Sequence, residues 1–79
     1  MTTLNRNDIF LKTMEREILT NKITPVLCVN SIFNLRLDIK EETAVADTLE
    51  NMLKVKNVVM ASLFRRAYDE AVKRRENLS

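Results

Sequence analysis

The side chains that could support catalysis are few in this sequence and stand apart from one another. The chain has no histidine, so the usual general base near neutral pH is absent. Its single cysteine, Cys28, lies between apolar neighbours, whereas a nucleophilic thiol needs a cation or a helix start close by to lower its pKa. Ser62 and Tyr68 are isolated polar groups with no base at a suitable spacing. We therefore predict that the protein is not an enzyme.

The sequence also offers no pattern for a metal or a cofactor. One cysteine without histidine cannot form a zinc site. The chain has no glycine, which phosphate-binding loops and dinucleotide fingerprints require. Its acidic pairs are better explained as helix caps, solvated faces and ion pairs: Glu15 and Glu17, Glu41 and Glu42, Asp69 and Glu70. We expect no catalytic residue, no metal ligand and no cofactor.

Length and composition indicate one small helical domain spanning residues 1–79. A chain of this size has a marginal core, and the lone cysteine excludes an internal disulfide, so oligomerisation is the remaining way to add stability. Without glycine and with one proline, the sequence is typical of helices joined by short turns. We expect an all-α fold, a small three- to four-helix bundle, in which the long C-terminal helix is the central or dimer-forming element.

The location expected from the sequence is the cytoplasm, or the host cytoplasm if the protein comes from a phage or virus. The longest apolar run, residues 26–29, is far shorter than a membrane span. The first eight residues lack the layout of a secretory signal. An unpaired cysteine suits a reducing compartment. No membrane association is expected.

Capping signals divide the chain into helices. Asn5 and Asp8 have capping-box spacing, with Leu4 and Ile9 placed as a hydrophobic staple, which predicts a first helix reaching about Thr20. Its expected buried residues are Phe10, Met14 and Ile18, with Leu11 and Leu19 alongside.

A second helix is predicted from Thr24 as N-cap and Pro25 at the first helical position to about Arg36. Its expected buried residues are Val26, Val29 and Phe33, with Cys28, Ile32 and Leu35. Residues 35–40 alternate apolar and polar at a period of two, so a strand stays open as the alternative in this region.

A third helix is predicted to start at Asp38, which has capping-box spacing to Glu41. Its expected buried seam is Ala46, Leu49, Met52 and Leu53. Residues 54–57 are either a turn, with Asn57 as the cap of a last helix, or part of one helix from about residue 39 to 76. We favour the turn.

The stretch 57–76 carries most of the functional argument. On a helical wheel its apolar residues cover roughly 220°, about twice the stripe that a surface helix needs. Such a helix needs neighbours on two sides, in its own chain or in a partner. The predicted protein-contact residues are Val59, Leu63, Phe64, Tyr68 and Val72, with Arg65 and Arg66 as anchors on the rim.

Charge changes sign along the chain. Residues 25–53 contain two basic and five acidic residues, a net of −3, while residues 54–79 contain seven basic and three acidic residues, a net of +4. Opposite charge of this kind sets the register of an antiparallel helix pair or of a self-complementary dimer.

The segment 49–67 resembles a helix-turn-helix, including those of region four of sigma factors. Its framework positions are Leu49, Leu53, Val55, Met60 and Leu63. It departs from that pattern at Glu50, where the family has a small residue, and at Lys54, where the turn has glycine. The resemblance implies that residues 57–76 form a recognition helix, with Lys56, Asn57, Ser62 and Arg65 towards bases or phosphates.

Together these observations favour a non-enzymatic protein that binds another protein, as a regulator, inhibitor or adaptor, and that forms a homodimer. The partner's identity is not encoded in any pattern we find. DNA binding through the helix-turn-helix is the alternative, although a net charge of +2 is low for that role. A role beside RNA or the ribosome depends only on the basic C-terminus.

Overall fold

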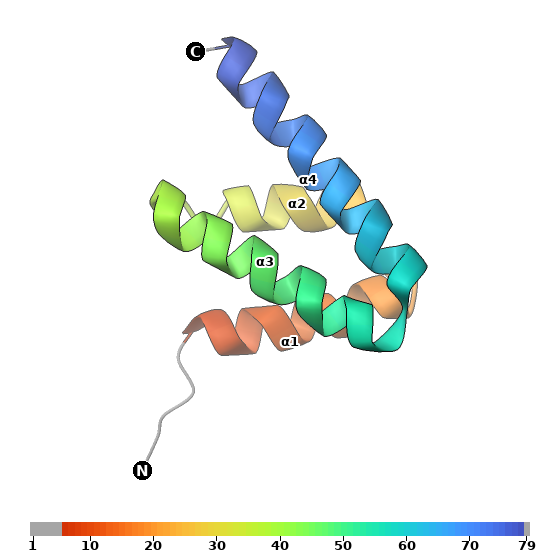
Figure 1. Ribbon diagram of the computed structural model, residues 1–79. Helices are drawn as coiled ribbons and strands as arrows, with labels where there is room; N and C mark the ends of the chain where they lie inside the picture. Colours follow the sequence, from red (N-terminus) through yellow and green to blue (C-terminus); the bar gives the residue numbers. More distant parts are fainter. Residues whose placement is uncertain (1–5, 79) are drawn as a thin grey trace.

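The computed structural model describes residues 6–78, which form four α-helices in chain order (Figure 1). Helix α1 spans Arg6–Leu19, α2 Pro25–Phe33, α3 Ile39–Lys56 and α4 Val58–Leu78. The predicted all-α fold of four helices is confirmed, and the long C-terminal helix packs against the others. Among these helices, none combines the length and apolar character needed to cross a bilayer.

The helix starts follow from capping residues. Thr24 accepts a hydrogen bond from the N–H of Leu27, with Pro25 at the first helical position. Asp38 accepts one from the N–H of Glu41 at 2.7 Å. These two predicted N-caps are confirmed. The predicted cap Asn5 and its neighbour Leu4 lie outside the described residues.

The connection between α3 and α4 is the single residue Asn57, which has an extended backbone with φ −157° and ψ 94°. Its side-chain oxygen accepts a hydrogen bond from the N–H of Met60 at 3.1 Å. The predicted break between the last two helices, with Asn57 as the cap, is therefore confirmed, and the continuous helix from 39 to 76 is excluded.

Two non-glycine residues in the left-handed region terminate the first two helices. Asn21, at φ 62°, follows α1, and the N–H of Lys22 donates to the carbonyl of Glu17 at 2.8 Å, as in a Schellman motif. Helix α2 ends at Phe33, three residues before the predicted end, and Arg36 takes φ 56°. Residues 35–38 form turn and coil rather than the alternative strand, and α3 begins at Ile39.

The core lies where α3 passes between α1 and α4, with α2 packed behind (Figure 1). Helix α3 contacts each of the other helices. The buried apolar residues come from all four helices: Leu11, Met14, Ile18, Cys28, Val29, Ile32, Val45, Ala46, Leu49, Leu53, Ala61, Phe64 and Tyr68.

Most of the predicted core residues are buried or pack against the core, but Val26 and Leu35 do not. Leu35 is half-buried in the turn that follows α2. Phe10, Phe33 and Met52 are half-buried at its edge. Val26 was expected inside and is exposed, because it lies in the first turn of a nine-residue helix whose buried face is Cys28, Val29 and Ile32.

Helix α4 has the two neighbours that its apolar circumference predicts. It packs against α3 on one side and α2 on the other. Its first turns meet α3 at a sharp corner, and its last turns continue past α2 (Figure 1). Most of the apolar arc is covered within the chain, and what remains uncovered defines the surfaces considered next.

Candidate protein interface

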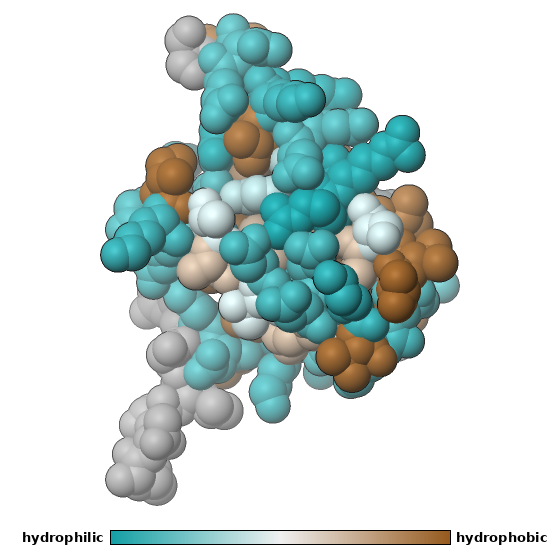
Figure 2. Space-filling model, viewed as in Figure 1, coloured by the Kyte–Doolittle hydropathy of each residue, from teal (hydrophilic) through white to brown (hydrophobic). Residues whose placement is uncertain are grey.

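Four aliphatic side chains are exposed around the junction of α3 and α4, and we call them the corner surface. They are Val55, Val58, Val59 and Leu63, with exposed fractions of 86%, 62%, 69% and 45%. Figure 2 shows apolar surface gathered at the right-hand side, where the two helices meet in Figure 1. Single exposed aliphatic residues are ordinary, but a group on one feature indicates a contact site.

The geometry of the junction explains why these residues are exposed. Val58 and Val59 occupy the first turn of α4, directly after the capping residue Asn57. Val55 precedes the junction in the last turn of α3, and Leu63 lies one turn beyond Val59 on the same face of α4. These four side chains therefore lie on faces of α3 and α4 that the rest of the described chain does not cover.

The predicted contact residues divide between this surface and the core. Val59 and Leu63 belong to the corner surface, while Val72 is half-buried against the core. Phe64 is completely buried, and its ring lies 6.4 Å from that of Tyr68, which is also buried. Phe64 and Tyr68 are thus core residues and not contact residues, because α2 and α3 cover that side of α4.

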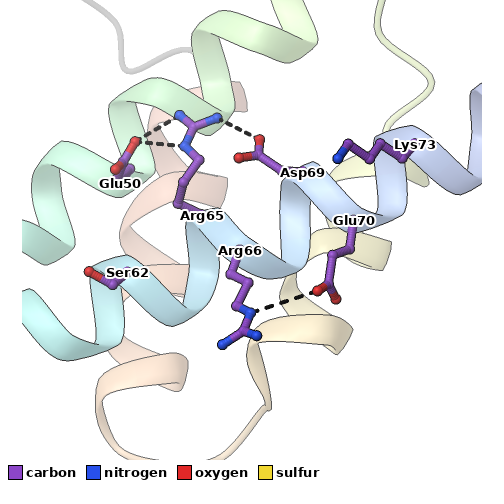
Figure 3. Close-up of a pocket in the computed structure, with 7 residues that line it drawn as sticks. All are labelled: Glu50, Ser62, Arg65, Arg66, Asp69, Glu70 and Lys73. Carbon is purple, nitrogen blue, oxygen red and sulfur yellow. Dashed lines mark hydrogen bonds and ion pairs between the residues drawn. The ribbon is translucent and has the colours of Figure 1, made fainter.

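Arg65, predicted as a rim anchor, is held within the chain. Its Nε donates to Glu50 of α3 at 2.9 Å, and its guanidinium also pairs with Asp47. Asp69, one turn along α4, lies 3.5 Å away (Figure 3). The guanidinium carbon is 5.4 Å from the centre of the Tyr68 ring. These contacts leave Arg65 little freedom to reach a partner.

The electrostatics of Arg65 agree with this restraint. Partial burial disfavours its charge, but hydrogen bonds to Glu50 and Asp47 and the attraction of both carboxylates outweigh burial and hold its pKa above its ordinary value. A cation fixed by two carboxylates of another helix is a tertiary link. Arg65 therefore joins α4 to α3.

Arg66 differs from Arg65 in its surroundings. Its side chain is highly exposed and makes one loose pair, 3.7 Å from Glu70, on the same face of α4 (Figure 3). Exposed pairs of this kind contribute little to stability. Arg66 follows Leu63 by one helical turn, and its role as a rim residue of an interface stays a prediction.

A shallow pocket of about 360 Å³ lies along this part of α4 (Figure 3). It is lined by Glu50, Ser62, Arg65, Arg66, Asp69, Glu70 and Lys73. Figure 3 shows Arg65 paired with Glu50 and Asp69, and Arg66 paired with Glu70. The one hydroxyl of the pocket, that of Ser62, has no base drawn beside it that would activate it as a nucleophile.

A second charge cluster, which the sequence did not predict, links the far ends of α3 and α4. Glu42 is 4% exposed, and Arg75 donates to both of its carboxylate oxygens, at 3.0 and 2.9 Å. The Tyr68 hydroxyl donates to the same carboxylate at 3.3 Å. The Arg75 guanidinium also lies 4.4 Å from the centre of the Phe33 ring. Of the three roles expected for the acidic pairs, Glu42 takes that of an ion-pair member, and it does so in a buried position that the sequence did not indicate.

These two clusters account for the change of charge sign along the chain. The carboxylates of α3 that face α4 meet Arg65 at one end and Arg75 at the other. Of the two interpretations given above, the antiparallel pair within one chain is the one observed. The acidic side chains Glu42, Asp47 and Glu50 are consequently already engaged.

Most of the side chains predicted for nucleic-acid contact already have a partner within the chain. Lys56 pairs with Glu15 of α1 at 3.3 Å, and the Asn57 side chain caps α4. Arg65 is held as described, which leaves Ser62 exposed on α4. Three of the four side chains therefore have structural partners inside the chain.

The junction also differs from the helix-turn-helix in its turn. That motif joins its helices through three or four residues, whereas Asn57 alone joins α3 to α4. Lys54, which the resemblance places in the turn, lies inside α3. Glu50, at the position of a small residue in that family, binds Arg65.

The remaining candidate for chemistry is Cys28, which is completely buried in α2. Burial, together with the negative charge of Glu17, raises the pKa of its thiol to about 12. A thiol of that pKa is protonated at neutral pH and has little nucleophilic character. Between residues 6 and 78, no three acidic or cysteine side chains lie close enough to hold a metal ion.

Comparisons with known protein families, with characterised proteins and with solved structures give no match for this chain. The functional argument therefore depends on the geometry of its own surface.

Proposed function

We propose that this protein is a non-enzymatic binding protein of the cytoplasm, or of a host cytoplasm, that acts through protein–protein contact as a homodimer. A small binding protein of this kind would act as a regulator, an inhibitor or an adaptor. The observation that carries the proposal is the corner surface, because Val55, Val58, Val59 and Leu63 stay exposed although the chain has a complete core.

Energetics supports a contact at this place. Removing a large aliphatic side chain from water contributes roughly 1.5–3 kcal/mol. A standard interface buries about 800 Å² on each side, so the four aliphatic residues would form its centre. Exposed polar residues such as Arg66 would form its rim. A small chain without a disulfide between its own residues also gains stability from association.

Sedimentation equilibrium tests the homodimer. We expect the wild type to dimerise at concentrations of about 10–100 µM and Leu63→Glu to stay monomeric, because a charge would be buried at the contact. Ile39→Glu is the control, since Ile39 is also an exposed aliphatic residue and lies at the end of α3 away from the corner. A wild-type monomer at about 1 mM would overturn the dimer. Equal loss in both variants would place the contact elsewhere.

The DNA-binding alternative makes a different prediction for the same protein. Phosphate contacts give an affinity that falls steeply with salt. Gel shifts over a salt series would therefore show strong retention of DNA at low salt if α4 is a recognition helix. Charge reversal at Lys56, the exposed cation among the residues predicted for nucleic-acid contact, would weaken that retention. Absence of retention at the lowest salt would exclude this alternative.

A further inference from the structure

A second surface lies further along α4, beyond the corner, and we call it the α2–α4 groove. It is a groove of about 410 Å³ between α2 and the C-terminal half of α4. Figure 1 shows α4 crossing α2 and continuing beyond it. The apolar part of its lining comes from both helices: Val26, Phe33, Ala67, Ala71 and Leu78.

The groove has an apolar floor that the chain itself does not cover. Val26 at the start of α2 and Leu78 at the end of α4 are exposed, by 59% and 87%. Between them Ala67 and Ala71 are half-buried and lie one turn apart on the same face of α4. Amphipathic helices dock in grooves of this kind through apolar residues spaced three and four apart.

The charge at the rim is positive. Arg74 lines the groove, is exposed, and has no ion pair with any residue in the described part of the chain. Glu70 also lines the groove, but its carboxylate is directed to Arg66 (Figure 3). The neighbouring Lys73 is likewise exposed on α4. The rim therefore attracts a partner with acidic side chains beside its apolar ones.

In a second copy of this chain, two side chains of the acidic segment in α3 are already bound, Glu42 by Arg75 and Glu50 by Arg65. Its C-terminal third has a net charge of +4, so a like-charged surface would meet the rim. Charge complementarity thus favours a different protein in the groove.

We propose that the α2–α4 groove binds an amphipathic helix of another protein, with apolar residues on the floor and acidic residues next to Arg74. The groove shares no lining residue with the corner surface, although Ala67 lies one helical turn beyond Leu63. A dimer joined at the corners would carry two such grooves, which is the arrangement of an adaptor.

Two designed helical peptides of about fifteen residues test the proposal. Both carry leucine at positions three and four apart, and they differ in having glutamate or lysine on the flanks. Methyl NMR spectra of the full chain are recorded during titration with each peptide. We expect the glutamate peptide to shift the signals of Val26, Ala71 and Leu78 and to bind about tenfold more tightly than the lysine peptide.

Two variants and a control sharpen the test. Ala71→Glu places a charge on the floor and abolishes binding of the glutamate peptide. Arg74→Glu reverses the preference, so that the lysine peptide binds about tenfold more tightly. Lys12→Glu, at an exposed residue of α1 outside the groove lining, leaves both affinities within about twofold. The reversal remains informative even if Ala71→Glu fails to fold.

Three results would overturn the groove. They are no binding of the glutamate peptide, equal binding of the two peptides, and shifts confined to Val55, Val59 and Leu63. The last result would assign the peptide to the corner surface. Dimerisation is measured separately with Leu63→Glu. A negative result for peptide binding in the groove therefore does not contradict the proposed homodimer, and a negative result for the homodimer does not contradict peptide binding.

Discussion

Arg75, near the end of α4, holds the buried carboxylate of Glu42 in the first turns of α3 through two hydrogen bonds of 3.0 and 2.9 Å. The two residues are thirty-three positions apart in the sequence. Because the Tyr68 hydroxyl shares the same carboxylate, a single anion connects three side chains. This cluster closes the far end of the α3–α4 pair.

We expect Arg75→Met to lower the free energy of unfolding by about 2 kcal/mol, because Glu42 would remain buried without its cation. This expected loss is smaller than for a fully buried ion pair, since the Arg75 side chain is 39% exposed and water screens its charge. Urea unfolding measures the change. Arg74→Met is the control, with an expected loss below about 0.5 kcal/mol. Equal losses in the two variants would show that the Glu42 cluster contributes nothing.

Phe64 and Leu63 are adjacent in sequence but lie in opposite environments. Phe64→Ala should cost about 3–5 kcal/mol, because it removes a completely buried ring. Leu63→Ala should cost less than about 1 kcal/mol in the monomer, since its side chain already faces water. Chemical denaturation at protein concentrations too low for dimerisation measures the loss of unfolding free energy in both variants. Similar costs would contradict the assignment of Phe64 to the core.

Cys28 makes the stability depend on alkaline pH. Its pKa is raised by burial to about 12, whereas the unfolded thiol has a pKa of 9.0. Between these values the unfolded state loses a proton that the folded state keeps, so this contribution is present below pH 9 and is lost as pH rises towards 12. The expected slope is about 1.4 kcal/mol per pH unit.

Urea unfolding of wild type and Cys28→Ala at several pH values above neutrality tests this dependence. Burial raises the pKa of Tyr68 as well, so both proteins should lose stability at high pH. The wild type should lose more, because only it carries the buried thiol. Parallel curves for the two proteins would contradict the assignment.

Arg36 occupies the left-handed region at φ 56°, where a side chain costs about 1–2 kcal/mol. Arg36→Gly should therefore raise the free energy of unfolding by roughly 0.5–1 kcal/mol, after the greater freedom of glycine in the unfolded chain is subtracted. Asn34→Gly is the control, because Asn34 has φ −68°. Asn34→Gly should lower the free energy of unfolding. Thermal unfolding separates the two outcomes by several degrees.

The helix starts could be predicted because their causes are local. Thr24, Asp38 and Asn57 each accept a hydrogen bond from an N–H three residues later. The residue type and its position before an apolar segment therefore suffice to predict where the helix starts. The early end of α2 was missed, since nothing near Arg36 in the sequence requires a left-handed residue. Glycine, the usual signal, is absent from this chain.

The side of α4 that stays exposed could not be predicted. The apolar arc of that helix includes Phe64 and Leu63 alike, and only the positions of α2 and α3 decide which is covered. Burial of Glu42 depends in the same way on Arg75, which is distant in sequence. The corner surface and the α2–α4 groove thus depend on tertiary packing, whereas the helices that form them depend on local sequence.

The one-residue junction at Asn57 has a consequence for how this chain can vary. Inserting one residue there would turn α4 by about 100° about its own axis, and a deletion would turn it by the same angle the other way. Either change would rotate Phe64 out of the interior and Arg65 away from its carboxylates. Related chains that keep this architecture should therefore tolerate exchanges of side chains at the junction but no change in its length.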